Sequence, residues 1–225
     1  MTISVVIPTW NEAVELPETL RRLRAVDEVR EILVSDAGST DATVSLATAA
    51  GARVITGARG RGGQLRRGSE AATGDVVWMV HADTWVEPDA GRAIRAALAD
   101  VAVVGGACLK EFRDPPWLTR GSAWRCAVRM QWFQFAYGDQ AIFIRRDLLT
   151  RIGGVPDVPL MEEFELCARM GRVGRLTLAG TVVTTSARRF RSFGVLRSYA
   201  RIGGVLLGYR MGLRPEVLAR IYGRR

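Results

Sequence analysis

Runs of β-branched residues alternate with helical segments through the first 85 residues, and this alternation restricts the fold more than any other feature of the sequence. The pattern predicts strands at residues 3–7, 32–35, 51–55 and 76–80, with helices between them. Strand, loop and helix repeated in this order are typical of right-handed crossovers between parallel strands. We therefore predict an α/β fold with a Rossmann-like, mostly parallel sheet flanked by helices.

Polar residues follow these strands where each one ends. Residues 76–80 form an apolar run, which predicts a strand buried on both faces, and His81 and Asp83 come directly after it. Asn11 and Glu12 follow the first strand, and Asp36 ends the second. Because ligands of open α/β sheets bind at the carboxyl ends of strands, these residues predict one site at one edge. A carboxylate there can hold a divalent cation and, through it, a diphosphate, although ordinary turn chemistry also favours such residues.

Composition limits the cellular setting and the class of partner. A chain of 225 residues suits one large or two small domains. Three cysteines without paired spacing, no long apolar stretch and no signal-peptide pattern predict a cytoplasmic protein. The net charge of +9 comes almost entirely from arginine, since Lys110 is the only lysine. Arginine suits phosphate, so nucleotides, nucleic acid or an anionic membrane surface are candidate partners, beside a merely well-solvated basic surface.

The motifs at the strand ends resemble those of a known family. Residues 5–12 (VVIPTWNE), residues 34–41 (VSDAGSTD) and the His81-Ala82-Asp83 triplet together resemble a family 2 glycosyltransferase of the GT-A fold. Gly60-Arg61, Gln64 and the run 138–140 (GDQ) resemble a narrower subgroup of small bacterial members, labelled radical-SAM/selenodomain-associated transferase 2. That label describes gene neighbourhood and names no reaction. The sequence has neither a G-x-G-x-x-G turn after the first strand nor a Walker P-loop.

The resemblance implies a site for a nucleotide-sugar donor. Asp83 would bind Mn²⁺ or Mg²⁺ bridging the diphosphate. The implied nucleotide-binding residues are Pro8, Thr9, Asn11, Glu12, Asp36, Arg61, Gln64 and His81. The residues implied at the diphosphate or the acceptor are Asp139, Gln140, Arg188 and Arg189. The sequence departs from the family at two places: an aspartate pair is Asp36-Ala37 here, and an Asp-x-Asp motif is His81-Ala82-Asp83.

The second half of the chain contains the candidate catalytic base. Glu162 and Glu163 lie at a predicted loop-to-helix entry, where acidic residues also favour a helix N-terminus. The resemblance aligns them with a Glu-Asp pair whose second member is the base, so Glu163 is expected to take the acceptor proton, with Glu162 beside it. Residues 117–135 are rich in aromatic rings and arginine, which suits either an acceptor surface or a buried helix. Residues 176–178 and 181–185 are expected to form a closing hairpin.

The C-terminal segment is predicted to be helical and basic. Residues 193–222 combine apolar positions with arginines, and Pro215 restarts the helix after a break. Such a segment can lie on a membrane surface, or it can pack on the domain or a second subunit. We predict a GT-A domain over residues 1–190, with a nucleotide-binding half (1–85) and an acceptor and catalytic half (86–190). An amphipathic helical extension covers residues 191–225.

These observations favour an inverting, metal-assisted glycosyltransferase. The donor would be a uridine- or guanosine-linked nucleotide sugar, and the acceptor a hydroxyl on a lipid or small metabolite. The expected location is the cytoplasm, including the inner face of the membrane. A nucleotidyltransferase, a basic nucleic-acid-binding module and a non-catalytic scaffold remain as alternatives. Acidic strand ends argue against nucleic acid because they repel phosphate in the absence of a metal.

Overall fold

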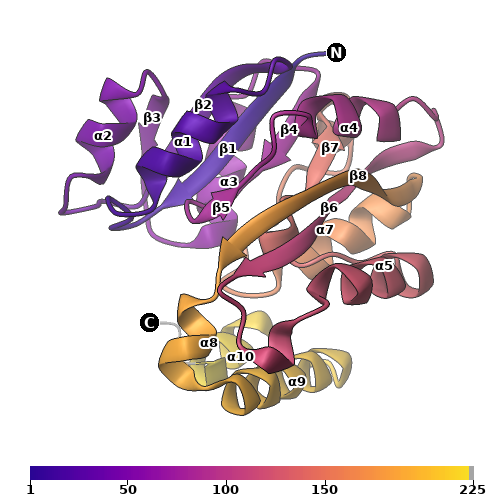
Figure 1. The fold of residues 1–225 in the computed structure, drawn as a ribbon. Coiled ribbons are helices and arrows are strands. Elements are labelled where there is room, and N and C mark those ends of the chain that lie inside the picture. The colour runs from indigo at the N-terminus through magenta and orange to yellow at the C-terminus, as the bar shows by residue number, and fades with distance from the viewer. Residues whose placement is uncertain (223–225) are drawn as a thin grey trace.

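Eight strands form one sheet in the computed structural model, which describes residues 1–222 apart from the side chains of Leu118 and Arg189 (Figure 1). The strand order across the sheet is β3-β2-β1-β4-β7-β6-β8-β5. The strands are β1 (Ile3–Thr9), β2 (Val29–Asp36), β3 (Arg53–Thr56), β4 (Val76–Met79), β5 (Thr84–Trp85), β6 (Val103–Arg113), β7 (Phe143–Arg145) and β8 (Arg175–Ser186).

The first four strands are parallel, as the sequence predicts. Alternate residues of each strand enter different cores. Val76 and Trp78 of β4 belong to the core on one face of the sheet, whereas Val77 and Met79 belong to the core on the other. Because both faces of β4 are buried, its sequence is continuously apolar. Parallel pairing also brings the carboxyl ends of β1, β2 and β4 to the same edge of the sheet.

The other half of the sheet is mixed, which the sequence pattern did not predict. β7 runs antiparallel to both β4 and β6, and β5 runs antiparallel to β8. The predicted hairpin is wrong, because residues 175–186 form the single strand β8 parallel to β6. The break in pattern near Gly180 is a bulge: Cys108 pairs with Ala179, but Leu109 pairs with Val182. Pairing with β6 continues on both sides of the bulge, so the chain does not need to turn.

Helices cover both faces of the sheet. One core contains side chains of α1 (Leu16–Arg24), α2 (Thr43–Ala49) and α4 (Ala90–Ala97). The other contains side chains of α3 (Arg61–Glu70), α5 (Ser122–Phe133), α6 (Arg146–Arg151) and α7 (Glu162–Gly171). Two short 3₁₀ turns, η1 (Trp117–Thr119) and η2 (Gly138–Gln140), flank α5 and precede β7. α3 begins at Arg61, directly after Gly60.

The glycines of α3 let it lie close to the sheet. A Cβ atom added at Gly68 would come within 2.3 Å of a Val6 side-chain carbon, and one at Gly62 within 2.5 Å of the Pro156 carbonyl oxygen. The glycine-rich residues 57–63 therefore lie partly in α3, which packs closely against β1 and against the loop before α7. This close packing fixes Arg61 and Gln64, which lie in the first turn of α3.

Three C-terminal helices pack together at one end of the molecule: α8 (Arg188–Phe193), α9 (Val195–Arg210) and α10 (Pro215–Tyr222) (Figure 1). Val205, Leu218 and Ala219 form a small core with Leu160 and Met161 of the loop before α7. The helical segment starts at Arg188, so the predicted boundary at 190/191 falls inside α8. β5 lies in the predicted nucleotide-binding half and pairs with β8 of the predicted acceptor half, so the two halves contribute to one sheet. Within residues 1–222, no helix is long and apolar enough to cross a membrane.

Candidate active site

A cleft of about 1010 Å³ runs from the edge of the parallel strands to the C-terminal helices. Its lining comes from both halves of the chain and from α8, α9 and α10. Ten residues predicted from the sequence line it: Pro8, Thr9, Glu12, Arg61, Gln64, His81, Asp83, Asp139, Glu163 and Arg188. The predicted residues Asn11, Asp36, Gln140 and Glu162 are not part of its lining. Arg189 has its side chain outside the described part of the structure.

Asp36 organises the loop after β2. Its carboxylate accepts hydrogen bonds from Thr9 Oγ1 (2.9 Å) and from the backbone N–H groups of Gly38 (2.9 Å) and Ser39 (2.8 Å). The Ser39 hydroxyl donates a further bond. Burial alone would raise the pKa of Asp36, but these donors hold it below its ordinary value. Asp36 is fully buried, and its side chain therefore shapes the edge of the site instead of facing the cleft.

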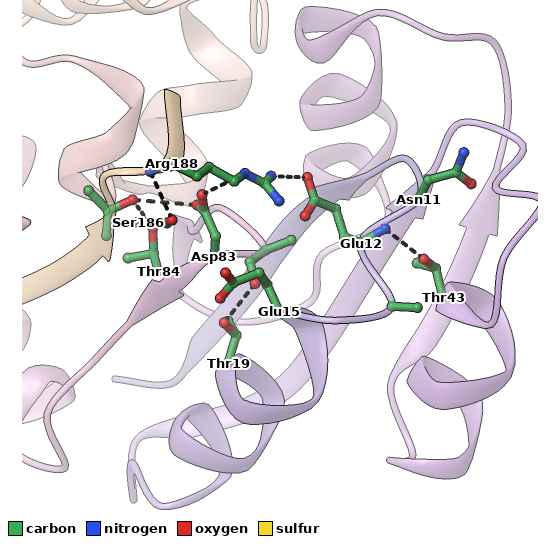
Figure 2. A network of polar contacts seen from close by, with 12 residues as sticks. Asn11, Glu12, Glu15, Thr19, Thr43, Asp83, Thr84, Ser186 and Arg188 are labelled. Atoms are coloured by element: carbon green, nitrogen blue, oxygen red, sulfur yellow. Dashed lines mark hydrogen bonds and ion pairs between the residues drawn. The ribbon is translucent and has the colours of Figure 1, made fainter. Parts of the chain in front are cut away.

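Asn11 and Glu12 tie the loop after β1 to the loop after β2. Asn11 has a positive φ of 54°, and its Oδ1 accepts a hydrogen bond from the Thr40 backbone N–H at 2.8 Å. The Glu12 backbone N–H donates to Thr43 Oγ1 at 2.8 Å, which leaves the Glu12 carboxylate directed at the cleft (Figure 2). Of the two residues after β1, Asn11 thus holds the turn, and Glu12 presents its carboxylate to the cleft.

Gln64 connects the ends of β1 and β2, beneath these loops, to α3. Its Nε2 donates to the carbonyl oxygens of Thr9 and Ser35, each at 2.8 Å, so it links the ends of β1 and β2 to α3. Beside it, the Arg59 guanidinium lies 3.5 Å from the ring centroid of Trp10. Trp10 is 43% exposed and lines the cleft with Arg59. An exposed ring under a cation suits stacking on a flat ligand such as a nucleobase.

Arg188 connects the two carboxylates that follow β1 and β4. Its Nη2 donates to Glu12 Oε1 at 2.6 Å, and its Nε lies 3.8 Å from Asp83 Oδ2 (Figure 2). Thr185 Oγ1 approaches Asp83 Oδ1 at 3.4 Å from the end of β8. The first residue of α8 therefore reaches back across 176 residues to the loop after β1.

Asp83 is in an environment that disfavours its charge. Burial raises its pKa to about 6; Arg188 and Arg113 oppose this rise, while Glu12 and Glu15 add to it. Arg113 is itself engaged, since it donates to Glu15 Oε2 at 2.7 Å and to the Asp83 carbonyl oxygen at 2.8 Å. A strongly perturbed carboxyl group in a cleft is typical of a functional site.

These carboxylates fit a divalent cation that is also held by a phosphate ligand. Glu12 Oε2 is buried and has no hydrogen-bond partner among the described residues, while the other oxygen of this carboxylate, Oε1, shares the Arg188 guanidinium with Asp83. No group of three or more His, Cys, Asp or Glu side chains within the described residues could hold a metal alone. Mg²⁺ and Mn²⁺ are commonly held by one or two carboxylates together with substrate phosphates and water. Asp83, with Glu12 next to it, meets that requirement.

Arg61 clamps the two glutamates that begin α7. Its Nη2 donates to Glu163 Oε2 at 2.8 Å, and its Nε donates to Glu162 Oε1. Met161 before them has a φ of 70°, which turns the chain sharply into the helix. Burial raises the pKa of Glu163; Arg61 lowers it and Glu162 raises it. Only Glu163 of the pair lines the cleft, while Glu162 is 1% exposed.

Asp139 lies opposite this pair on η2. Lys110 Nζ donates to Asp139 Oδ2 at 2.8 Å, and this cation offsets the effect of burial, so that the pKa of Asp139 is lowered. Gly138 is close to His81, since a Cβ atom added there would lie 3.1 Å from His81 Nε2. Gln140 is fully buried and bonds the Cys108 carbonyl oxygen at 3.2 Å, so it holds the turn.

Sequence reasoning missed several residues of the cleft. Arg59, Trp10 and Lys110 were not singled out, and the C-terminal helices were not expected to line the site. The signal for Lys110 was present, because it is the only lysine in the chain. The contribution of α9 had no sequence signal, since it arises from packing between segments far apart along the chain.

Carboxylates at the ends of parallel strands thus share one cleft with a partly buried glutamate at the start of α7. The chain belongs to glycosyl transferase family 2, whose family model matches residues 4–154. An undecaprenyl-phosphate 4-deoxy-4-formamido-L-arabinose transferase of Sodalis glossinidius is 31% identical over 131 residues, which cover 52% of this chain and 40% of that protein. The chain thus spans less than half the length of this curated relative.

Solved structures agree on the fold. The mannosyltransferase PcManGT from Pyrobaculum calidifontis, in complex with GDP-Man and Mn²⁺, has a TM-score of 0.64 and 25% identity over 81% of this chain and 56% of its own. Glucosyl-3-phosphoglycerate synthase from Mycobacterium tuberculosis, in complex with Mn²⁺, UDP and glucosyl-3-phosphoglycerate, has a TM-score of 0.60 and 24% identity over 82% and 70%. The predicted fold class and family are confirmed; the narrower subgroup stays a prediction.

Proposed function

We propose that this chain is an inverting glycosyltransferase that moves a sugar from a uridine- or guanosine-linked nucleoside diphosphate to an acceptor hydroxyl. The observation that carries the proposal is one cleft lined by Asp83 at the strand edge and by Glu163 at the start of α7. The two carboxyl groups face the same space from opposite halves of the chain. One suits the donor diphosphate, and the other suits an acceptor.

Each residue has a defined task in this proposal. Trp10 and Arg59 would stack the nucleobase against the loops that Asp36 and Gln64 hold in place. Glu163 would take the proton of the acceptor hydroxyl as its oxygen bonds to the anomeric carbon. The bond from that carbon to the diphosphate breaks at the same time, and the nucleoside diphosphate leaves.

Asp83 would hold Mn²⁺ or Mg²⁺, with Glu12 as a second oxygen donor. When bound, the metal ion would supply positive charge to the diphosphate as it departs. Arg188 would supply further charge to the same group, because its side chain is half exposed and reaches this point from α8. In the described structure its guanidinium satisfies Glu12, so donor binding would exchange a carboxylate partner for a phosphate partner.

A thermal-shift screen tests the donor site. The protein is heated with UDP, GDP, CDP or dTDP, each with Mn²⁺, Mg²⁺ or a chelator. We expect UDP or GDP to raise the melting temperature only when metal is present, because ligand binding to the folded state stabilises it by mass action. At one hundred times the dissociation constant, this amounts to about 2.7 kcal/mol. No shift with any combination would contradict the proposal.

A nucleotidyltransferase is the closest alternative, since it would also bind a nucleotide and a metal at this edge. The product distinguishes the two reactions: a glycosyltransferase releases a nucleoside diphosphate, whereas a nucleotidyltransferase releases pyrophosphate. Glu163 favours sugar transfer, because activation of an acceptor hydroxyl needs a base across the cleft from the diphosphate. A nucleic-acid module would instead show salt-dependent binding of DNA or RNA without binding any sugar nucleotide.

We also propose that residues 188–225 form a basic extension that contacts an anionic membrane surface. This segment has ten of the 32 basic residues and one of the 23 acidic residues, so it accounts for the whole net charge of +9. It exposes Leu196 (75%) and Leu207 (61%) on α9 and Met211 (74%) directly after α9. Exposed apolar side chains among arginines are typical of helices that lie in the membrane interface.

Vesicle flotation tests this contact. We expect binding to vesicles that contain phosphatidylglycerol and no binding to phosphatidylcholine alone, with loss above about 0.5 M salt because surface charge is screened. Arg197→Gln with Arg210→Gln removes two exposed charges and should weaken binding by roughly 30-fold, at about 1 kcal/mol per arginine. Arg92→Gln with Arg95→Gln on α4 removes the same charge elsewhere and should have little effect. Equal binding by both double variants would contradict the proposal.

A further inference from the structure

The half of the cleft that faces away from the strand edge has its own chemical character. Its cations come from α5 and α9, and its rings come from β6, α8 and α9. Figure 1 shows α9 with α8 and α10 at the lower end of the molecule, beyond the ends of β6 and β8, and α5 beside β6 above them. None of the residues that we assign to the donor lies on α5 or α9. This half is therefore the place where an acceptor would bind.

The arginines of this half lack acidic partners. The other described ion pairs of the cleft couple Arg61 to Glu163, Lys110 to Asp139 and Arg188 to Glu12. By contrast, Arg125, Arg129 and Arg201 have no carboxylate within 4.0 Å among the described side chains, and all three line the cleft.

The neutral contacts of these three arginines do not cancel their charge. Arg125 donates to the carbonyl oxygens of Arg120 (2.7 Å) and Thr119 (2.8 Å), which fixes its guanidinium. Arg129 lies 4.4 Å from the ring centroid of Tyr137, and its Nε is buried without a hydrogen-bond partner among the described residues. Arg129 lowers the pKa of Asp139, but that carboxylate already accepts a hydrogen bond from Lys110 at 2.8 Å, so the three guanidinium groups add an excess of positive charge. Excess positive charge in a cleft concentrates anions, so this half suits an anionic ligand.

Aromatic and aliphatic side chains continue from these cations toward the C-terminal helices. Phe190 links Phe112 and Tyr199, with ring centroids 5.2 Å and 5.4 Å apart. Ile202 and Leu206 of α9 line the cleft beyond them. An anion alone would gain nothing from this wall, whereas an apolar chain would bury surface against it. The two halves of the lining therefore fit a ligand with a charged head and an apolar tail.

We propose that this half of the cleft binds an amphiphile with a phosphate headgroup and an alkyl or prenyl chain. Arginine is suited to the headgroup because its planar guanidinium can donate two parallel hydrogen bonds to phosphate oxygens. The identification of this amphiphile as the sugar acceptor requires that it also have the hydroxyl from which Glu163 takes the proton, and it rests on the proposed function. Its binding does not, since neither nucleotide nor metal takes part.

Calorimetry with three probes tests the site: decyl phosphate below its micelle concentration, decyl glucoside with the same chain, and inorganic phosphate. Decyl phosphate should bind at least about 10-fold more tightly than the glucoside, because hydrogen bonds between charged groups are worth roughly 1.5–3 kcal/mol. It should exceed inorganic phosphate by more, because only it has the chain. Equal binding of both decyl probes would overturn the headgroup assignment. Inorganic phosphate binding as tightly would reduce the site to one for free phosphate and overturn the amphiphile.

Matched variants locate the contact. Arg201→Gln removes a charge that lines the cleft and should weaken decyl phosphate roughly 10-fold while leaving decyl glucoside unchanged. Arg197→Gln, one turn earlier on α9 and outside the lining, is the control and should change neither. An equal loss in both variants would overturn the proposal. The thermal-shift screen for the donor separates the two proposals. If decyl phosphate bound but no nucleotide did, the amphiphile site would be supported and the proposed glycosyltransferase activity would be contradicted.

Discussion

Asp83→Asn is expected to lower turnover by about 10³-fold and to abolish metal-dependent stabilisation by the nucleoside diphosphate. Asparagine keeps the shape of the side chain but removes the anionic oxygen that we assign to the metal. Loss of the metal removes several kcal/mol of charge stabilisation, and about 4 kcal/mol corresponds to this factor. The measurement is nucleoside diphosphate released from the donor, combined with the thermal-shift screen.

The stability of the ligand-free variant separates this effect from misfolding. Burial raises the pKa of Asp83 from 3.8 to about 6, so the folded state holds this proton more tightly than the unfolded chain. The resulting stabilisation is complete below pH 3.8 and is lost as the pH rises through 6. At pH 7.5 the charged carboxylate of Asp83 therefore destabilises the folded state, and asparagine at this position does not. We expect ligand-free Asp83→Asn to melt no lower than the original protein.

Asp89→Asn is the matched control for removing one aspartate charge. Asp89 precedes α4, is exposed and makes no capping hydrogen bond through its side chain. Turnover and metal-dependent stabilisation should both persist in this variant. If Asp83→Asn retained full turnover with metal present, the metal role of Asp83 would be wrong.

The parallel half of the fold could be predicted because its physical signal is local. β1 and β4 are buried on both faces, so their own residues reveal them without knowledge of their neighbours. Asn11 and Asp36 mark where β1 and β2 end, and the parallel order then brings those ends to one edge. The site edge followed directly from this, as did the convergence of Glu12 and Asp83.

The rest depended on contacts between distant segments. β7 inserts antiparallel between β4 and β6, and nothing in its three residues states a direction. The bulge in β8 imitates a turn, because a glycine in a strand and a glycine in a hairpin have the same local signature. The sequence therefore predicted the class of fold but not the order of strands in its second half.

Ion pairs across the cleft were equally hidden. Arg61 and Glu163 are 102 residues apart, and Arg188 and Glu12 are 176 residues apart. Composition indicated an excess of arginine, and the family resemblance indicated which acids matter, but pairing needs the fold. The same holds for α9, because the sequence suggested a membrane surface, or packing on the domain or a second subunit, and only the fold places Arg201 in the cleft. Charge alone cannot distinguish a membrane surface from a ligand pocket.

Glu163→Gln is expected to lower turnover by roughly 10²–10⁴-fold, the usual contribution of a general base. Glutamine keeps the length of the side chain and a hydrogen bond to Arg61, but it cannot take a proton from the acceptor. Stabilisation by nucleoside diphosphate and metal should be unchanged, since this carboxylate is assigned to the acceptor side. If Glu163→Gln lost its stabilisation by nucleoside diphosphate and metal, Glu163 would belong to the donor site instead.

The pH profile identifies the base. Burial raises the pKa of Glu163, so the reactive, deprotonated form becomes populated at a higher pH than for an ordinary glutamate. Turnover of the original protein should therefore rise with pH as Glu163 loses its proton, and Glu163→Gln should lose this limb of the profile. Glu162→Gln is the matched control, because Glu162 bonds the same Arg61 but does not line the cleft. It should retain the limb and most of the turnover. A profile that loses the limb in Glu162→Gln and keeps it in Glu163→Gln would transfer the role of base to Glu162.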